Sequence, residues 1–133
     1  MTEQQKGKFD LNKQIAYWCN SSDEDWEVAN ELVDRGRTRH GLFFAHLALE
    51  KMLKAHVCRA TQELAPKIHN LLRLSQLSGL SFSVAHQAFL ARFDRYQLEG
   101  RYPEHLPSPP EKSKAQRDLK QAEEVRQWLK NQL

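Results

Sequence analysis

Arginine and histidine side chains occur close together at two places in this sequence of 133 residues. Four residues separate Arg35 from His40, and three separate Arg101 from His105. Such a pair can cleave RNA without a metal ion, because histidine moves the proton of the 2′-hydroxyl while a guanidinium holds the phosphate. Each pair also has a structural interpretation: helix capping and solubility around Arg35, and a turn around Arg101. The spacing leaves both interpretations open.

A further candidate is the pair His46 and Glu50, which stand four residues apart on an expected helix. They could share a metal ion or act as an acid and a base, but two ligands from one helix do not make a metal site. We therefore expect no metal and no cofactor, and a buried His46 that is hydrogen-bonded to Glu50 or to a neighbouring helix. Glu50 also precedes Lys54 by four residues, which predicts an ion pair on the wetter face of that helix.

The elements that must position these groups follow from apolar residues that recur at helical spacing. The pattern predicts a first helix from Ile15 to about Gly36, a second from Thr38 to Ala60, a short third from Asn70 to Ser78, a fourth from Ser81 or Ser83 to Gly100, and a last from Glu111 to Asn131. The second helix is apolar around most of its circumference, so we expect it at the centre of the protein. The fourth directs Ala85, Phe89, Phe93 and Tyr96 to the core. A new helix starting at Ser21 is an alternative to one continuous first helix, since Ser21 and Glu24 form a capping box.

The sequence therefore predicts an all-α protein, an up-and-down four-helix bundle with one additional short helix. Only five glycines and five prolines occur, and four of those prolines fall in residues 100–110, which we expect to form a loop. We interpret residues 1–12 as a polar tail and residues 13–133 as a single domain.

Charge is distributed unevenly along the chain, although the net charge is only +3. Residues 1–34 hold three basic and eight acidic side chains, whereas residues 35–73 hold eight basic and two acidic ones. The two segments could pack against each other, or the basic one could await an anionic partner. No apolar run is long enough to span a membrane, so we expect no membrane contact. Cys19 and Cys58 lie far apart in the sequence, unlike the cysteines of a zinc site or a disulfide-rich secreted protein. We therefore interpret both as ordinary thiols and expect a cytoplasmic protein.

Several motifs in order resemble one family, the HEPN domain. They are Trp26-Glu27-Val28-Ala29, then Gly41-Leu42-Phe43-Phe44-Ala45-His46-Leu47-Ala48-Leu49-Glu50-Lys51-Met52-Leu53-Lys54-Ala55, then Lys67-Ile68-His69-Asn70-Leu71, and finally Arg101-Tyr102-Pro103-Glu104. The resemblance covers about residues 13–130. It implies a bundle of four main helices and a short one, a homodimer, and a minimal nucleotidyltransferase as partner.

The resemblance also implies a module that binds a nucleotide or RNA. In this sequence the contacts would come from Arg101, Tyr102 and His105, with Lys54 and His69 as neighbours. The guanidinium would hold phosphate, and Tyr102 would stack on a base.

Two alternatives remain. One branch of the family consists of metal-independent endoribonuclease toxins of toxin–antitoxin pairs, in which the catalytic residues here would be Arg101 and His105. That branch has a wider spacing between its arginine and histidine, and here Pro103 lies in the gap. Arg35 and His40 have the wider spacing but lie between the first two helices. The other alternative is a purely structural protein–protein interaction domain.

Overall fold

The computed structural model describes residues 10–97 and 108–133, and these form helices without any strand. The helices are α2 (Leu11–Asp34), α3 (Thr38–Thr61), α4 (Leu71–Leu77), α5 (Val84–Phe93) and α7 (Lys112–Asn131). The predicted all-α class is confirmed. None of the helices in this part of the chain has both the length and the apolar composition that a bilayer span requires.

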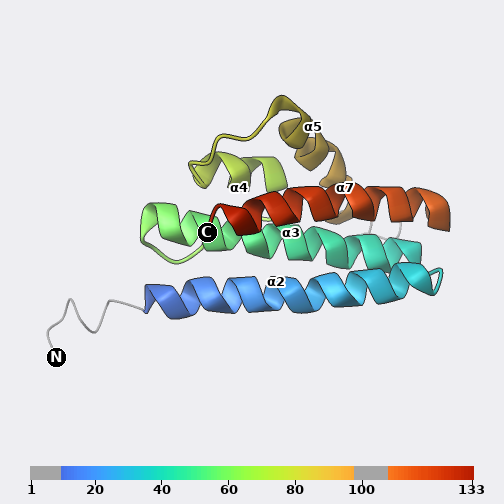
Figure 1. Cartoon of the computed structure of the whole chain (residues 1–133), viewed down its shortest axis with the longest axis horizontal. Helices are drawn as coiled ribbons and strands as arrows, with labels where there is room; N and C mark the ends of the chain where they lie inside the picture. Colours follow the sequence, from blue (N-terminus) through green and yellow to red (C-terminus); the bar gives the residue numbers. More distant parts are fainter. Residues whose placement is uncertain (1–9, 98–107) are drawn as a thin grey trace, which may run out of the picture.

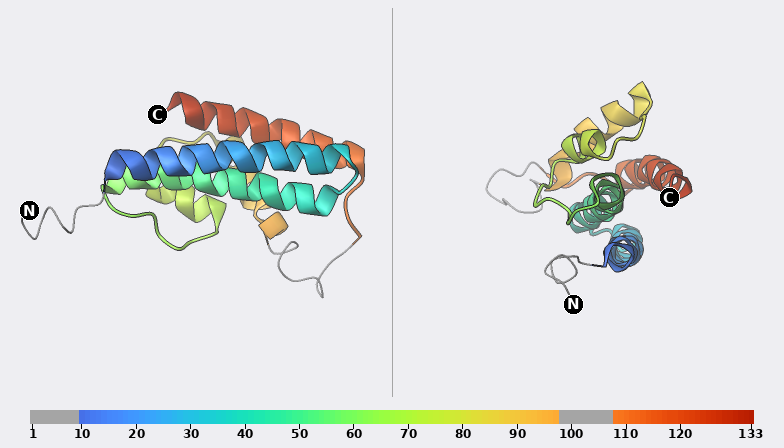
Figure 2. Two further views of the ribbon diagram at one scale, coloured as in Figure 1. Left: turned by 90° about the horizontal axis from the view of Figure 1, so that it is seen from below. Right: turned by 90° about the vertical axis from the view of Figure 1, so that its left-hand side faces the viewer.

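Three long helices, α2, α3 and α7, lie side by side, with α3 in the middle (Figure 1). Helix α2 runs antiparallel to α3, and α4 and α5 cover the side of the bundle opposite α2 (Figure 2). The protein is therefore the expected helical bundle. Its fourth main helix is α5, which has only 10 residues and is inclined to the long helices.

Short polar side chains begin three of the helices, as the capping rules require. The side chains of Asp10, Asn70 and Ser83 accept hydrogen bonds from the backbone N–H three residues later, at 3.1, 2.8 and 3.0 Å. Gly36 and Gly79 follow the ends of α2 and α4 with φ of 83° and 74°, a conformation that glycine adopts at little cost.

The structure decides several details that the pattern left open or placed differently. Helix α2 is continuous through Ser21, and it begins at Leu11 rather than Ile15. Helix α5 ends at Phe93 rather than at Gly100, and residues 95–97 are helical again. Ala85 is exposed rather than buried, because it lies in the first turn of α5 and lines an open groove against α7 instead of packing in the core.

Burial is concentrated in α3, as expected for the central helix. From Gly41 to Cys58 most of its side chains have little or no exposed surface. A polar residue in the apolar stripe of α2, Ser22, is fully buried and donates a hydrogen bond of 2.6 Å to the carbonyl of Ala48 on α3. Both cysteines are free thiols, and burial raises the pKa of Cys19 and of Cys58.

Helices α2 and α3 approach each other closely at Gly41. A Cβ atom at this position would lie 2.4 Å from Cγ2 of Val33 and 3.0 Å from the carbonyl oxygen of Ala29. Because no side chain fits there, the spacing of the two longest helices depends on a glycine inside a helix.

We expect Gly41→Ala to lower the free energy of unfolding by about 1–3 kcal/mol, although alanine is the better helix former by about 1 kcal/mol. Removing the Val33 Cγ atoms should relieve part of the clash. Chemical denaturation of Gly41→Ala, Val33→Ala and the double variant should therefore give a double variant that is more stable than the sum of the single effects predicts. Simple additivity would contradict the close approach.

His56 is a second buried group that joins two helices. Its side chain is 3% exposed, and Nε2 lies 2.8 Å from the carbonyl oxygen of Leu129 on α7, so Nε2 carries the proton and donates it. Burial lowers the pKa of His56 below its ordinary value of 6.5; the hydrogen bond to Leu129 opposes this, and the charge of Arg59 adds to it.

A lowered pKa in the folded state means that the unfolded chain takes up the proton first as the pH falls. The contribution of His56 to stability is complete above its ordinary pKa of 6.5 and declines as the pH drops below that value. We expect the unfolding free energy of wild type to fall more steeply between about pH 7 and about pH 5 than that of His56→Gln. Equal slopes in urea denaturation would show that His56 does not titrate in this way.

Candidate functional site

Two of the predicted site residues come together in the structure. Lys54 of α3 and His69, just before α4, both contact the carboxylate of Glu50. The other three predicted residues, Arg101, Tyr102 and His105, lie outside the described residues. The candidate site is therefore built here from the polar cluster around Glu50.

The Glu50 carboxylate is surrounded by donors from its own helix and from the α3–α4 connection. Nζ of Lys54 lies 3.1 Å from Oε2, and Nδ1 of His69 lies 3.2 Å from each carboxylate oxygen. Nδ1 of His46 also lies 3.8 Å from Oε1, which is too far for a hydrogen bond. Each oxygen thus has at least one donor near it, as a buried carboxylate requires.

The predicted ion pair between Glu50 and Lys54 is present, but its expected position on the wetter face is wrong. Glu50 is 4% exposed and Lys54 is 6% exposed. His69 lies against the carboxylate, and the ring of Trp18 on α2 lies 5.4 Å from the Lys54 ammonium, so side chains from two neighbouring elements surround the pair. The pattern of one helix could not reveal these neighbours.

A second carboxylate, Asp94 at the end of α5, joins three elements. Its Oδ1 lies 2.9 Å from Nε2 of His46 and accepts a hydrogen bond of 3.1 Å from the backbone N–H of Leu71. Its Oδ2 accepts one of 3.0 Å from the side-chain amide of Asn70. Because a carboxylate only accepts, His46 carries its proton on Nε2. His46 is buried and bonded to a neighbouring element, as expected, but only through Nε2, since its Nδ1 has no hydrogen-bond partner among the described residues.

The exposed member of the cluster is His69, whose side chain is 48% accessible, compared with 5% for Glu50 and 7% for Lys54. Its Nδ1 faces Glu50 and therefore carries a proton. Its Nε2 has no hydrogen-bond partner among the described residues. His69 can thus present a ring nitrogen to a ligand while Glu50 fixes the orientation of the ring.

The residues on either side of 98–107 are attached to the same helix as this cluster. Before the segment, Asp94 contacts His46 on α3. After it, the carbonyl of Pro110 accepts a hydrogen bond of 2.7 Å from the Thr38 hydroxyl, also on α3. Thr38 and His46 are eight residues apart on one helix, which corresponds to about 12 Å.

Helix α7 also contacts the residues that precede 98–107. The Tyr96 hydroxyl donates a hydrogen bond of 2.5 Å to Asp118, and Lys114 lies 3.0 Å from the same carboxylate oxygen. Burial and the neighbouring carboxylate raise the pKa of Tyr96, so its hydroxyl keeps its proton and remains a donor.

The opposite charges of the first two segments are only partly explained by mutual packing. Asp25 of α2 pairs with Lys51 of α3 at 2.7 Å. Asp23 instead pairs with Arg126 and Lys130 of α7, and Asp34 lies 3.9 Å from Lys112 of α7. Several basic residues of the second segment are exposed and have no ion pair within the described chain; among them are Arg35, Arg37, Lys67 and Arg73.

Sequence reasoning missed Asp94 and Trp18, whose contacts come from elements distant in the sequence, and no signal in one sequence marks them. The described residues contain no group of three histidine, cysteine or acidic side chains arranged to hold a metal ion. The second arginine–histidine pair, Arg35 and His40, lies exposed at the junction of α2 and α3.

We expect Glu50→Ala to lower the unfolding free energy by about 3–5 kcal/mol, because it leaves the buried Lys54 ammonium without its anion. Replacing both residues by apolar ones, in Glu50→Leu with Lys54→Met, should recover most of that loss. Chemical denaturation measures both effects. If the double variant is as unstable as the sum of its single variants, the two groups do not act as a buried pair.

Comparisons with known proteins agree with this fold. The chain is similar to the crystal structure of TT1696 from Thermus thermophilus, with a TM-score of 0.76 and 19% sequence identity, over 90% of this chain and 98% of that chain. No curated protein matches. The family model of the HEPN domain matches residues 15–132, which is most of the chain. The chain therefore belongs to the HEPN domain family.

Proposed function

We propose that this HEPN domain is a binding module for a nucleotide or RNA, and that the ligand lies against the side of α3 that carries Glu50. In this proposal His69 contacts the ligand directly, and the buried Lys54 lies beneath it, where it offsets the charge of the Glu50 carboxylate. Arg101, Tyr102 and His105 complete the site from the segment between α5 and α7. The observation that carries the proposal is the meeting of His69 and Lys54 at one carboxylate beside Asp94.

The chemistry of His69 suits a phosphate. With Nδ1 held by Glu50, Nε2 is the ring nitrogen left for a ligand, and an imidazole N–H can donate a hydrogen bond to a phosphate oxygen. The Arg101 guanidinium would add a bidentate phosphate contact, and Tyr102 would supply a stacking surface for a base.

The anchoring of both flanks supports the participation of residues 101–105. Asp94 and Pro110 hold the chain on α3 at His46 and Thr38. His46 is one helical turn from Glu50, so the segment leaves the described structure close to the cluster. Family membership supports an assembly in which the module acts as a homodimer together with a minimal nucleotidyltransferase.

The proposal predicts that fluorescently labelled single-stranded RNA binds the purified protein in an anisotropy assay. Arg101→Ala should weaken binding about tenfold or more, because it removes a charge-assisted contact, and Tyr102→Ala should weaken it about fivefold. His69→Gln should also weaken it. Arg117→Ala is the matched control, since Arg117 is an exposed arginine of α7, and it should bind as wild type does.

Salt separates the proposal from a purely structural interaction domain. Affinity for RNA should fall linearly with salt on logarithmic axes, because phosphate contacts release counterions. An absence of binding to RNA and to free nucleotides, or binding that Arg101→Ala leaves unchanged, would reject the proposal.

Incubation with RNA in the presence of a chelator tests the endoribonuclease alternative. Cleavage that Arg101→Ala and His105→Ala both abolish would make the protein a metal-independent endoribonuclease. The binding module predicts intact RNA in the same assay.

A further inference from the structure

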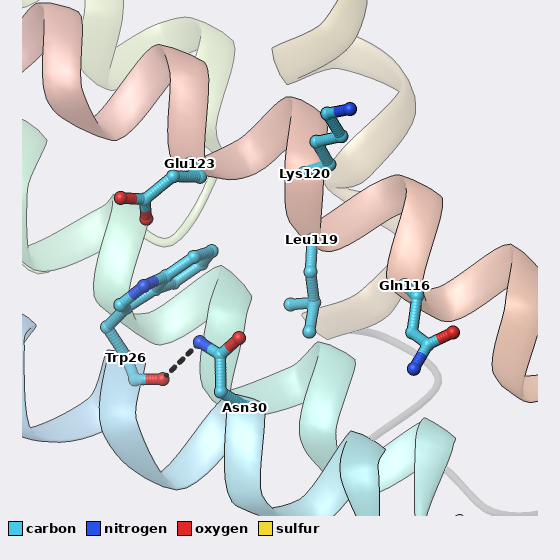
Figure 3. Close-up of a pocket in the computed structure, with 6 residues that line it drawn as sticks. All are labelled: Trp26, Asn30, Gln116, Leu119, Lys120 and Glu123. Carbon is cyan, nitrogen blue, oxygen red and sulfur yellow. Dashed lines mark hydrogen bonds between the residues drawn. The ribbon is translucent and has the colours of Figure 1, made fainter.

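A groove of about 530 Å³ lies between α2 and α7, and its lining includes no residue of the Glu50 cluster. Trp26 and Asn30 of α2 form one wall, and four residues of α7 form the other: Gln116, Leu119, Lys120 and Glu123 (Figure 3). The indole of Trp26 and the side chain of Leu119 give the groove an apolar floor, and polar groups surround it.

Two of the polar side chains that line the groove, Asn30 and Glu123, present hydrogen-bond acceptors. The Asn30 side-chain nitrogen donates to the carbonyl of Trp26 at 2.9 Å, so its carbonyl oxygen is left on the groove side (Figure 3). The Glu123 carboxylate lies above the indole, and it has no ion pair or hydrogen bond within the described chain (Figure 3). Lys120, the basic residue of the rim, points away from the indole (Figure 3).

Trp26 already contacts one cation. The guanidinium of Arg126 lies 5.3 Å from the ring centroid, within the range of cation–π attraction, and Asp23 holds that guanidinium in place. The groove thus combines an indole, an unpaired carboxylate and an amide oxygen, which is the combination that binds a second organic cation.

Glu27 and Glu31 of α2 are exposed, but each lies one position beyond a groove residue and so faces another direction on the helix; neither lines the groove. The acidic side chain that lines it is Glu123. The unpaired Glu123 carboxylate disfavours an anionic occupant, whereas an arginine or lysine side chain with its long alkyl stem matches both the apolar floor and the acceptors.

We propose that the groove between α2 and α7 is a docking site for a basic segment of a partner protein, whose arginine or lysine side chain packs on Trp26 and pairs with Glu123. This assignment is argued from charge complementarity and the aromatic floor, and it does not depend on the proposed RNA site.

A labelled oligoarginine peptide with blocked ends is the probe, and fluorescence anisotropy gives its affinity. Glu123→Gln should weaken binding about threefold to fivefold, the usual effect of an exposed ion pair. Lys120→Gln should strengthen binding, because it removes the only basic side chain that lines the groove within the described chain. An oligoglutamate peptide of equal length should not bind.

The matched control is Glu124→Gln, which removes the same charge one residue further along α7. Glu124 is also exposed but lines a different pocket, together with His86 and Arg92 of α5, so this variant should bind oligoarginine as wild type does. In addition, the indole N–H resonance of Trp26 should shift on titration, whereas that of Trp18, which lies near Lys54, should not.

Three outcomes would overturn the proposal. The first is equal weakening by Glu123→Gln and Glu124→Gln, which would mean non-specific attraction. The second is binding of RNA or oligoglutamate at the Trp26 resonance. The third is self-association of the wild-type chain that Glu123→Lys abolishes in sedimentation, which would show that a second copy fills the groove.

Discussion

The arrangement of the smaller helices depends on two carboxylates, the buried Glu50 and the half-buried Asp94. A carboxylate removed from water must be given donors, and here those donors come from α3 itself, from the start of α4 and from the residues just before it. Asp94 accepts both from His46 and from the backbone of Leu71, so α5 can end only where α3 and α4 lie close together. Apolar contacts bring these helices together without fixing their register, whereas the directional hydrogen bonds fix it.

The same constraint explains why His69 is held in one orientation although half of its side chain is exposed. An exposed histidine ordinarily samples several rotamers, and ordering it on binding costs conformational entropy. Here the Glu50 carboxylate binds Nδ1 in the free protein, and Lys54 balances part of the charge of Glu50. A ligand that approaches Nε2 would meet a group that is already oriented, so less of its binding free energy would be lost in ordering the site.

The long helices could be predicted from the sequence because their signals are local. Apolar spacing located α2, α3 and α7 to within a few residues, and Asn70 and Ser83 marked the starts of α4 and α5. The candidate site was only partly predictable. Lys54 and His69 were identified through family resemblance, but the partner that unites them with Asp94 depends on packing between distant elements. Asp94 sits among Phe93, Arg95 and Tyr96 and has no local feature that distinguishes it from a surface residue.

The distribution of charge between helices has a further consequence. Asp23 and Asp34 of α2 form ion pairs with basic residues of α7. These two acidic residues therefore do not neutralise the basic residues at the ends of α3. Helix α7 in turn neutralises only part of α2, and Glu27 and Glu31 remain exposed without an ion pair among the described residues. One small bundle thus keeps unpaired basic side chains at the two ends of α3 and exposed acidic side chains along α2. Surfaces of opposite sign on one molecule attract different partners, and since exposed charges farther apart than about 10 Å are largely screened at physiological salt, each surface can act without the other.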